Sequence, residues 1–273
     1  MKWTTSIFAL AAFGLAACGG GESEEPAAPE TAAPEMAAEE EPTPEVVDPV
    51  AGSVAHPDRP ADDVEGDERR KPAETLGFIG LEPGMTVIDM EAGGGYFTEL
   101  YSRVVGEGGK VYMQNPPSFD GFLGDALETR LGGERLGNVV VMRTNFDNLD
   151  APDGSVDVVT WIQGPHELWF EVNGESLGDP EATFAEIARV LKPGGVFVAI
   201  DHRAAEGAGT EAGGTVHRIE EEIIRSYAEG AGLVFKSSAD FLSNPDDPLT
   251  NSVFDPSIRG QTDQFVIAYG KPE

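Results

Sequence analysis

Three of the four histidines in this 273-residue chain follow predicted strands, where a bound substrate would lie. Neutral imidazole near pH 7 can act as a general base, a hydrogen-bond partner or a metal ligand. We predict His166 and His202 as catalytic residues, with His166 as the first choice. Two other interpretations stay open. His202 and His217 can form a metal site with Asp201 and Glu220, or the histidines can cap strands and bind neighbouring carboxylates.

A glycine-rich turn separates a predicted strand from a predicted helix within residues 87–99. Gly93, Gly94 and Gly95 let the backbone adopt positive φ and approach a ligand closely, and the helix that follows presents unpaired N–H groups. The turn is therefore a candidate cofactor-binding loop. A purely structural strand-to-helix turn has the same sequence features, so both interpretations stand at this point.

Short apolar runs alternate with amphipathic stretches along most of the chain, which is typical of a mainly parallel sheet covered by helices. The predicted strands are residues 85–90, 110–114, 138–142, 155–161, 195–200 and 264–269. The predicted helices are residues 96–105, 121–131, 180–191 and 219–230. A doubly wound parallel domain binds ligands at the carboxyl ends of its strands. We therefore expect the functional site in the loops that follow the strands.

Three motifs together resemble the class I S-adenosylmethionine-dependent methyltransferases. They are the strand and glycine turn of residues 87–99, Asp-Gly-Ser-Val-Asp-Val-Val at 153–159, and Leu-Lys-Pro-Gly-Gly-Val-Phe at 191–197. The chain is also similar to a branch of predicted bacterial methyltransferases in segments 70–74, 93–95, 201–204 and 216–219. The resemblance covers residues 70–273. It implies a doubly wound, mostly parallel, seven-stranded α/β sheet of the Rossmann-like methyltransferase type with an antiparallel last strand.

The resemblance also implies S-adenosylmethionine as the cofactor and assigns residues to its parts. The methionine portion is expected at the turn, the ribose after the second strand and the adenine after the third. Glu91 replaces the first glycine of the usual turn, where its side chain would crowd the cofactor or reach its amino group. The cofactor residues implied in this way are Asp89, Glu91, Gly93, Gly94, Gly95, Gln114, Asn115, Asn145, Phe146 and Asp147.

The N-terminus has the features of an export signal. Residues 1–18 contain Lys2, an apolar stretch too short to span a bilayer, and the sequence Leu-Ala-Ala-Cys at 15–18. This end resembles the lipobox of bacterial lipoproteins, which implies lipidation of Cys18 as the mature N-terminus. Gly19 follows the cysteine, which in that class implies sorting to the outer membrane. We therefore predict a bacterial cell-envelope protein, lipid-anchored in the periplasm, whose membrane contact is the anchor alone.

Composition separates an acidic tether from the folded domain. Residues 19–50 contain Pro, Ala and Glu without Lys, Arg or aromatic residues, so we predict a disordered tether followed by an α/β domain at 51–273. The formal net charge of −31 argues against nucleic-acid binding through a basic face. With one cysteine, the chain has no internal disulfide and no multi-thiolate zinc site. We expect the basic run 69–71 to pair with neighbouring acids, and segment 244–260 to form a lid.

Two functional classes remain from the sequence. The first is a lipid-anchored enzyme that uses S-adenosylmethionine to methylate a small-molecule acceptor, and the glycine turn favours it. The second is a non-enzymatic periplasmic binding protein on a degenerate methyltransferase fold. Export favours this second class, because S-adenosylmethionine is made in the cytosol. We prefer the enzyme, although fold does not by itself fix function.

Overall fold

The computed structural model describes residues 48–273. The predicted signal peptide, the lipidation site Cys18 and tether residues 19–47 lie outside the described residues. Helix α1 (Pro49–Val54) is capped by the side chain of Asp48, which accepts a hydrogen bond from the amide of Val50 at 2.9 Å. The first turn of α1 thus includes Pro49 and Val50, which the sequence analysis assigned to the tether.

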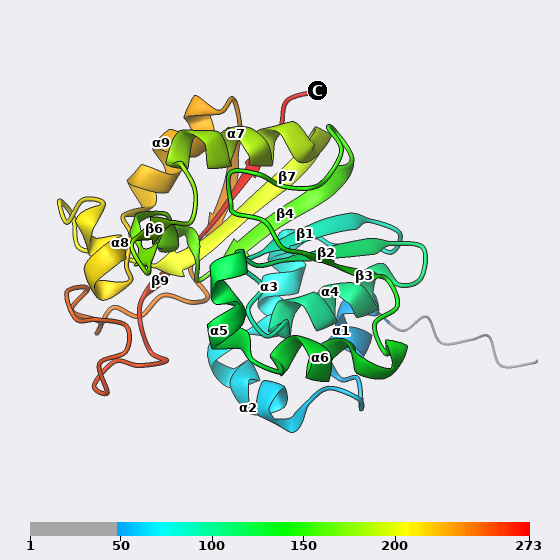
Figure 1. The fold of residues 1–273 in the computed structure, drawn as a ribbon. Helices are drawn as coiled ribbons and strands as arrows, with labels where there is room; N and C mark the ends of the chain where they lie inside the picture. The colour runs from blue at the N-terminus through cyan, green and yellow to red at the C-terminus, as the bar shows by residue number, and fades with distance from the viewer. Residues whose placement is uncertain (1–47) are drawn as a thin grey trace, which may run out of the picture. The chain divides into compact units, whose positions relative to one another are not determined.

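A seven-stranded mixed sheet forms the centre of the domain (Figure 1), in the order β3-β2-β1-β4-β7-β9-β8. The strands are β1 (Thr86–Met90), β2 (Lys110–Gln114), β3 (Val139–Met142), β4 (Val156–Ile162), β7 (Leu191–His202), β8 (Val234–Ala239) and β9 (Gln264–Gly270). Strand β9 runs antiparallel to both its neighbours, whereas β1, β2, β3, β4 and β7 are parallel. The predicted α/β fold, a doubly wound, mostly parallel sheet with an antiparallel last strand, is confirmed. A separate hairpin consists of β5 (Glu171–Val172) and β6 (Glu175–Ser176).

The central strands are apolar on both faces because helices cover both sides of the sheet. Side chains alternate along each strand, so Val159 and Trp161 of β4 enter one hydrophobic cluster and Val158 enters the other. Helices α7 (Pro180–Val190) and α9 (Glu221–Gly230) contribute to the first cluster. Helices α3 (Pro72–Ile79) and α4 (Tyr96–Val105) contribute to the second, on the opposite side of the sheet in Figure 1. Both faces of the central strands are therefore buried, whereas the edge strands β3 and β8 are partly exposed.

One predicted helix is interrupted. Residues 121–131, predicted as a single helix, instead form α5 (Asp120–Leu123) and α6 (Ala126–Leu131). Gly124 separates them with φ 49° and ψ −126°, a conformation open to glycine but outside the helical region. The remaining helices are α2 (Ala61–Arg70) and α8 (Glu211–Val216), with short 3-10 segments η1 (Pro117–Phe119), η2 (Gly132–Glu134) and η3 (Pro165–Trp169). Among residues 48–273 no helix combines the length and apolarity needed to cross a bilayer.

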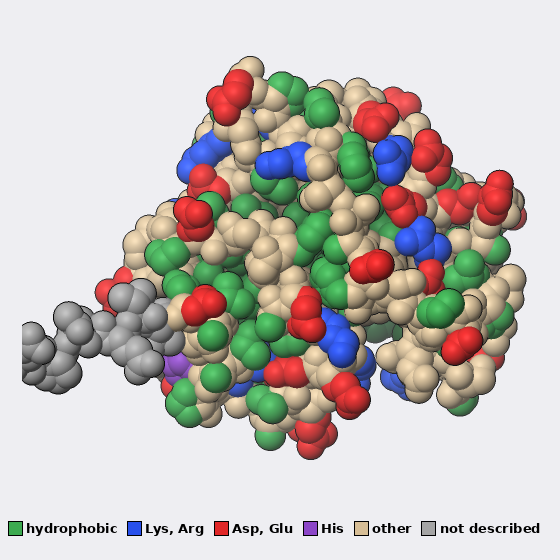
Figure 2. Space-filling view, turned by 180° about the vertical axis from the view of Figure 1, so that it is seen from behind, with side chains coloured by type: hydrophobic (Ala, Val, Ile, Leu, Met, Phe, Trp, Pro, Cys, Tyr) green, Lys and Arg blue, Asp and Glu red, His purple; other side chains and the backbone are tan. Residues whose placement is uncertain are grey.

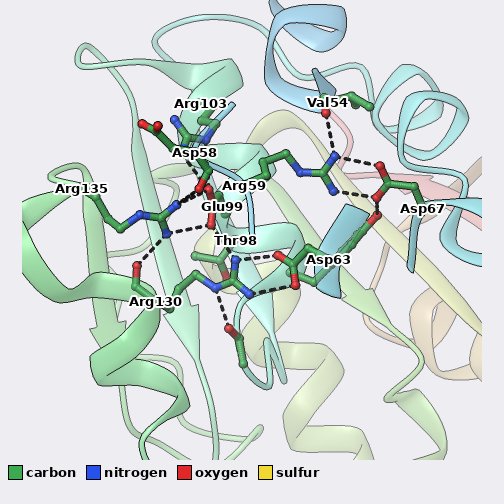
Figure 3. A network of polar contacts seen from close by, with 12 residues as sticks. Val54, Asp58, Arg59, Asp63, Asp67, Thr98, Glu99, Arg103, Arg130 and Arg135 are labelled. Carbon is green, nitrogen blue, oxygen red and sulfur yellow. Dashed lines mark hydrogen bonds and ion pairs between the residues drawn. The ribbon is translucent and has the colours of Figure 1, made fainter. Parts of the chain in front are cut away.

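A buried polar network joins α2 and α6 to α4 (Figure 3). The Glu99 carboxylate of α4 accepts hydrogen bonds from Arg103 at 2.7 Å, Arg130 at 2.6 Å and Arg135 at 2.7 Å. Arg130 also donates to Asp63 of α2 at 2.6 Å. Burial alone would raise the pKa of Glu99, but the three guanidinium groups lower it to about 2. The network therefore holds α2 and α6 beside the start of α4, where the glycine turn lies.

Candidate active site

The turn between β1 and α4 needs unusual backbone geometry. Glu91, Gly93 and Gly95 have φ of 51°, 55° and 83°. The φ of Gly95 favours glycine, and a Cβ there would lie 2.9 Å from Met113 Cε, so the end of that side chain would have to move. A Cβ at Gly94 would make only an ordinary 3.6 Å contact with Ala126. The turn is thus tightly packed at Gly95 and open at Gly94.

Gln114 and Asn115 at the end of β2 accept hydrogen bonds from backbone amides of this turn. Gln114 Oε1 accepts a hydrogen bond from the Glu91 amide at 2.8 Å, and its Nε2 donates to the Thr144 carbonyl at 2.6 Å. Asn115 Oδ1 accepts from the Gly93 amide at 2.9 Å. Both side chains are buried. Sequence analysis assigned them to the cofactor ribose, whereas in this structure their polar atoms hold the turn in shape.

A cavity of about 320 Å³ opens at the turn. Asp89 at its base is buried, and its Oδ2 accepts a 2.6 Å hydrogen bond from Thr98 Oγ1. Burial raises the pKa of Asp89 to about 7, although Thr98 and the charge of Arg70 act against the shift. The Arg70 guanidinium lies over the Tyr96 ring, 4.5 Å from its centroid. The cavity is lined by Asp63, Arg70, Asp89, Glu91, Ala92, Gly93, Gly94, Tyr96, Phe97, Arg130, Ile162 and Gln163.

The residues predicted to contact adenine do not line this cavity. Phe146 is fully buried, with its ring centroid 4.7 Å from that of Trp161, so it is a core residue and its predicted contact with adenine does not fit this structure. Asn145 is exposed, and Asp147 accepts a hydrogen bond from the Asp179 amide at 3.0 Å. Phe146 was assigned to the cofactor by its position after β3, but the turn that follows the strand places its side chain in the core.

Glu91 borders the cavity, but its carboxyl group is held on the side of β4. Its Oε2 accepts a hydrogen bond from Trp161 Nε1 at 2.9 Å. A Cβ at Gly164 would lie 2.2 Å from the same oxygen, so only glycine leaves room for it. Burial raises the pKa of Glu91 well above its usual value, and the negative charge of Glu167 adds to the shift. The expected contact between Glu91 and the amino group of the cofactor stays a prediction, since Glu91 lines the cavity and its hydrogen bond to Trp161 uses one carboxyl oxygen.

A second cavity of about 700 Å³ adjoins the first and shares Arg70 and Gln163 with it. Basic side chains gather where the surface is hollowed beside the β8–β9 segment in Figure 2. Arg69, Arg70 and Arg259 form no ion pair with any carboxylate of residues 48–273. The lining is Arg69, Arg70, Gln163, His202, Val253, Phe254, Pro256, Arg259, Gly260, Thr262 and Gln264, without Asp or Glu. The expectation that the basic run pairs with neighbouring acids is therefore wrong for Arg69 and Arg70.

The segment between β8 and β9 forms one wall of this second cavity and is anchored from within. Arg218 and Asp247 make a fully buried ion pair at 2.9 Å. Arg218 also donates to the Asn251 carbonyl at 2.7 Å, and Asp247 Oδ2 accepts from the Asp263 amide at 2.7 Å. Burial would raise the pKa of Asp247, but Arg218 and the backbone amides lower it. The predicted lid at 244–260 is a wall tied to the domain by a buried charge pair.

His202 lines the second cavity, as expected of a residue that contacts substrate. Its Nδ1 lies 2.7 Å from Thr262 Oγ1. Burial lowers the pKa of His202 to about 4, so its imidazole is neutral at pH 7. A neutral ring at a cavity wall can accept a hydrogen bond or a proton from a bound molecule.

His166 occupies a different position from the one its sequence context suggested. It is buried, and its Nδ1 lies 2.8 Å from Asp201 Oδ1, while its amide donates to Asp201 Oδ2 at 2.7 Å. Its Nε2 faces Glu167 and His217, each at 3.3 Å. Burial alone would lower the pKa of His166, but Asp201 and Glu167 raise it to about 10. His166 borders neither cavity, so direct contact with a substrate there does not fit this structure.

The metal-binding set considered from the sequence does not assemble. His202 contacts Thr262, and the Glu220 carboxylate accepts hydrogen bonds from the amides of Gly207 and Gly209 at 3.0 and 2.8 Å. His217 lies instead beside Glu167, with 3.1 Å between Nδ1 and Oε1. Within residues 48–273 the only group of potential metal ligands is His166, Glu167 and His217. Glu167 was missed because nothing in its sequence context distinguishes it from a surface acid.

Comparison with known proteins connects this site to methyltransferases. The family model described as a methyltransferase domain matches residues 89–199, from the end of β1 to β7. A ubiquinone/menaquinone biosynthesis C-methyltransferase UbiE from Shewanella pealeana is 30% identical over 133 residues, which are 46% of this chain and 46% of the relative. The matching region thus spans about half the length of such relatives.

Solved structures share the fold at low sequence identity. A SAM-dependent methyltransferase from Aquifex aeolicus superposes with a TM-score of 0.53 at 21% identity, covering 76% of this chain and 98% of that one. A geranyl diphosphate methyltransferase in complex with SAM gives 0.54 at 16% identity, with coverages of 81% and 94%. The domain therefore has the Rossmann-like methyltransferase fold. The family match supports methyltransferase chemistry and S-adenosylmethionine as the cofactor.

Proposed function

We propose that this chain is an S-adenosylmethionine-dependent methyltransferase that acts on a small anionic molecule. The observation that carries the proposal is a pair of adjoining cavities at the carboxyl edge of the sheet. One lies at the glycine turn and the other is lined by unpaired arginines, and they share Arg70 and Gln163. A cofactor in the first and an acceptor in the second would meet at these two residues.

The first cavity offers opposite charges for the amino-acid end of the cofactor. Asp89 at the base is an acceptor for an ammonium group, and Arg70 is a donor for a carboxylate. Gly94 is open to the cavity, so a ligand can approach the backbone there. Arg130 donates to the Gly94 carbonyl at 2.8 Å and to Asp63, which holds the turn against α2.

The second cavity favours an acceptor with a carboxylate, phosphate or sulfate group. Its three arginines have no carboxylate partner in residues 48–273, although the protein carries a net charge of −31. Burial lowers the pKa of Arg70, although the charges of Asp63 and Asp89 act against the shift, so the cation is partly desolvated without a carboxylate in direct contact. An anionic acceptor would offset that cost. Phe254 and Val253 supply apolar surface for the rest of the molecule.

Bound S-adenosylmethionine would supply an electrophilic methyl group. Transfer then depends chiefly on holding the acceptor in line with that group, which is the role of the arginines and Gln163. His202 is neutral at pH 7, and the contact between its Nδ1 and Thr262 fixes the ring and leaves Nε2 to take a proton from an acceptor hydroxyl or amine.

Calorimetric titration of the full chain with S-adenosylmethionine and S-adenosylhomocysteine tests the cofactor site. We expect micromolar dissociation constants, about −8 kcal/mol. Gly94→Asp should abolish binding because its carboxylate fills the cavity. Gly94→Ala is the matched control, since a Cβ fits there at 3.6 Å from Ala126. Equal binding by Gly94→Asp and the parent chain would place the cofactor elsewhere.

Production of S-adenosylhomocysteine with panels of anionic and neutral acceptors tests the second cavity. Arg259→Gln should raise KM for anionic acceptors and leave cofactor binding unchanged, whereas His202→Ala should lower kcat at unchanged cofactor affinity. Turnover of neutral acceptors alone, with no effect of Arg259→Gln, would contradict an anionic substrate.

A second candidate is a non-enzymatic binding protein on the same fold. It is favoured because the residues expected to contact the ribose and adenine of the cofactor are engaged elsewhere. Gln114 and Asn115 are hydrogen-bonded to the turn, and Phe146 is buried in the core. The absence of binding heat and thermal shift with millimolar cofactor, together with binding of anionic small molecules, would support this candidate over the enzyme.

We also propose that the chain is exported and anchored through Cys18 in the bacterial cell envelope, at the outer membrane. The lipobox-like residues 15–18 and the acidic segment 19–50 support this placement. Expression in a Gram-negative host with labelled palmitate should label the parent chain and not Cys18→Ser, and the parent should fractionate with the outer membrane. An unlabelled parent chain in the cytosolic fraction would refute the anchor.

A further inference from the structure

We propose that His166, Glu167 and His217 bind a divalent transition-metal ion of the zinc type. His166 Nε2 lies 3.3 Å from both Glu167 Oε1 and His217 Nδ1, and the latter two atoms are 3.1 Å apart. In a tetrahedral site with metal–ligand bonds of about 2.0–2.1 Å, ligand atoms lie roughly 3.3–3.4 Å from one another. The three atoms thus already have nearly the spacing of one face of a zinc site.

Hydrogen bonds alone do not account for this triangle. Each imidazole nitrogen can carry one hydrogen atom and the carboxylate oxygen carries none when ionised, so at most two of the three edges can be hydrogen bonds. The other oxygen of Glu167, Oε2, is buried without a hydrogen-bond partner in the described chain. A metal ion contacts all three ligand atoms at once and replaces the missing third interaction.

The charges around the triangle also favour a cation. Asp201 is buried against His166, the partly buried Glu167 contacts both His166 and His217, and the carboxyl group of Glu91 lies close by. None of these three acids forms an ion pair with a Lys or Arg of residues 48–273. Among residues 48–273, the only ion-pair partners of Asp201 and Glu167 are these histidines. A dication bound to the imidazole nitrogens would replace the ring protons as the positive charge beside the two carboxylates.

The surroundings of His166 match those of a metal-binding imidazole. Metal-ligating histidines usually donate their second ring N–H to a carboxylate, which fixes the ring and aims the other nitrogen at the metal. Asp201 is in that position, 2.8 Å from Nδ1, and is itself fixed by the His166 amide. Two histidines and one glutamate are also a ligand set found in catalytic zinc sites with an open fourth position. No fourth His, Cys, Asp or Glu of residues 48–273 joins the group.

The fold brings the third ligand to the other two by a close helix contact. A Cβ at Gly213 or Gly214 would lie 2.5 Å from the carbonyl oxygens of His166 and Trp169 respectively, so glycine is required for α8 to pack on η3. His217 directly follows α8 with φ 57° and ψ 49°, a left-handed conformation that a non-glycine residue adopts at a cost. Such strain persists only where neighbouring contacts enforce it. The geometry thus positions His217 for its contact with η3.

The ion would lie behind the wall of the second cavity. Phe254, which lines that cavity, packs edge-on against His217 with 4.9 Å between ring centroids. Bound metal would tie η3, which follows β4, to the end of α8 and so stiffen this wall. The proposal does not depend on cofactor binding, so it can hold or fail independently of the methyltransferase assignment.

The full chain, stripped with a chelator, should be titrated with Co²⁺ as a spectroscopic probe and with Zn²⁺ in competition with a chromophoric chelator. We expect one equivalent of metal, with visible Co²⁺ bands typical of four- or five-coordinate geometry. Zn²⁺ affinity should fall at least 100-fold in Glu167→Gln and in His217→Gln. Asp201→Asn, which alters only the positioning residue, should lower affinity 10–100-fold.

Two histidine controls separate this site from others. His56→Ala removes a histidine remote from the cluster, and His202→Ala removes the histidine of the cavity wall. Both should retain full affinity. Circular dichroism and urea unfolding identify any variant that fails to fold. The metal affinities of the ligand variants that do fold then test the proposal. The proposal is overturned if the parent binds less than 0.1 equivalent at about 100 µM metal, if folded Glu167→Gln and His217→Gln bind like the parent, or if His202→Ala abolishes binding.

Discussion

Replacing Asp89 with asparagine should stabilise the protein relative to the parent chain, and this gain in the free energy of unfolding should be larger at pH 8 than at pH 5. Burial raises the pKa of Asp89 from 3.8 to about 7 in the folded state. Between these values the folded protein binds more protons than the unfolded chain, so ionisation of Asp89 destabilises the fold as pH rises. The effect begins near pH 3.8 and is complete above pH 7.

The shift of about 3 pKa units corresponds to about 4 kcal/mol at high pH, at 1.36 kcal/mol per unit. Applied to one titrating site, the same values give a cost of about 1.7 kcal/mol at pH 5 and about 4.3 kcal/mol at pH 8. The free energy of unfolding of Asp89→Asn minus that of the parent should therefore increase by about 2–3 kcal/mol between pH 5 and pH 8. The substitution also alters the hydrogen bond from Thr98, which shifts this difference by an amount that does not depend on pH.

Urea unfolding of both proteins at pH 5, 6, 7 and 8 measures the difference directly. Asp150→Asn, an exposed substitution of the same type, serves as the control and should give a constant difference. A difference for Asp89→Asn that stays within about 0.5 kcal/mol across this range would refute the raised pKa. If the cofactor ammonium lies beside Asp89, binding at pH 7 should also release about half a proton, detectable by calorimetry in buffers of different ionisation enthalpy.

Three further predictions concern the fold around the site. Gly164→Ala should lower the free energy of unfolding by about 1–3 kcal/mol through overpacking, whereas Gly121→Ala, with open space around its Cβ, should have little effect in the same urea assay. Because the pKa of Glu99 is lowered to about 2, its contribution to stability is present above pH 4.5 and is lost as pH falls towards 2. Glu99→Gln should therefore weaken the fall in the free energy of unfolding below pH 4.5. A variant whose free energy of unfolding falls as steeply as that of the parent chain would contradict this. Asp247→Ala should lower the free energy of unfolding by about 3–5 kcal/mol, because it leaves Arg218 buried without a partner. Hydrogen exchange should become faster in residues 240–263, and a variant as protected there as the parent chain would contradict this prediction.

Six of the seven strands were predicted because they are local apolar patterns, whereas β8 (Val234–Ala239), which is largely exposed at the edge of the sheet, was not predicted. Residues 110–114 and 96–105 were predicted with the bounds that β2 and α4 have, since apolar periodicity and flanking glycines act over a few residues. The break at Gly124 was not predicted, because apolar spacing continues through it and only the backbone conformation reveals the end of α5.

The candidate site was predictable only in part. The glycine turn and His202 lie at cavities as their positions after strands imply. Arg70 was assigned to local ion pairs because acids surround it in sequence, yet α2 carries it over Tyr96 and between the two cavities. Phe146 was assigned to the cofactor, although the turn after β3 places its ring in the core.

Sequence alone determined the class of fold and the edge of the sheet where the two cavities open, because hydrophobic periodicity and glycine turns are encoded by residues close together in the chain. Only the tertiary structure decided which polar groups meet. The contact between His166 and His217 joins residues 51 positions apart and depends on two glycines that let α8 lie against η3. Such contacts follow from packing across the whole domain, which no local pattern of residues specifies.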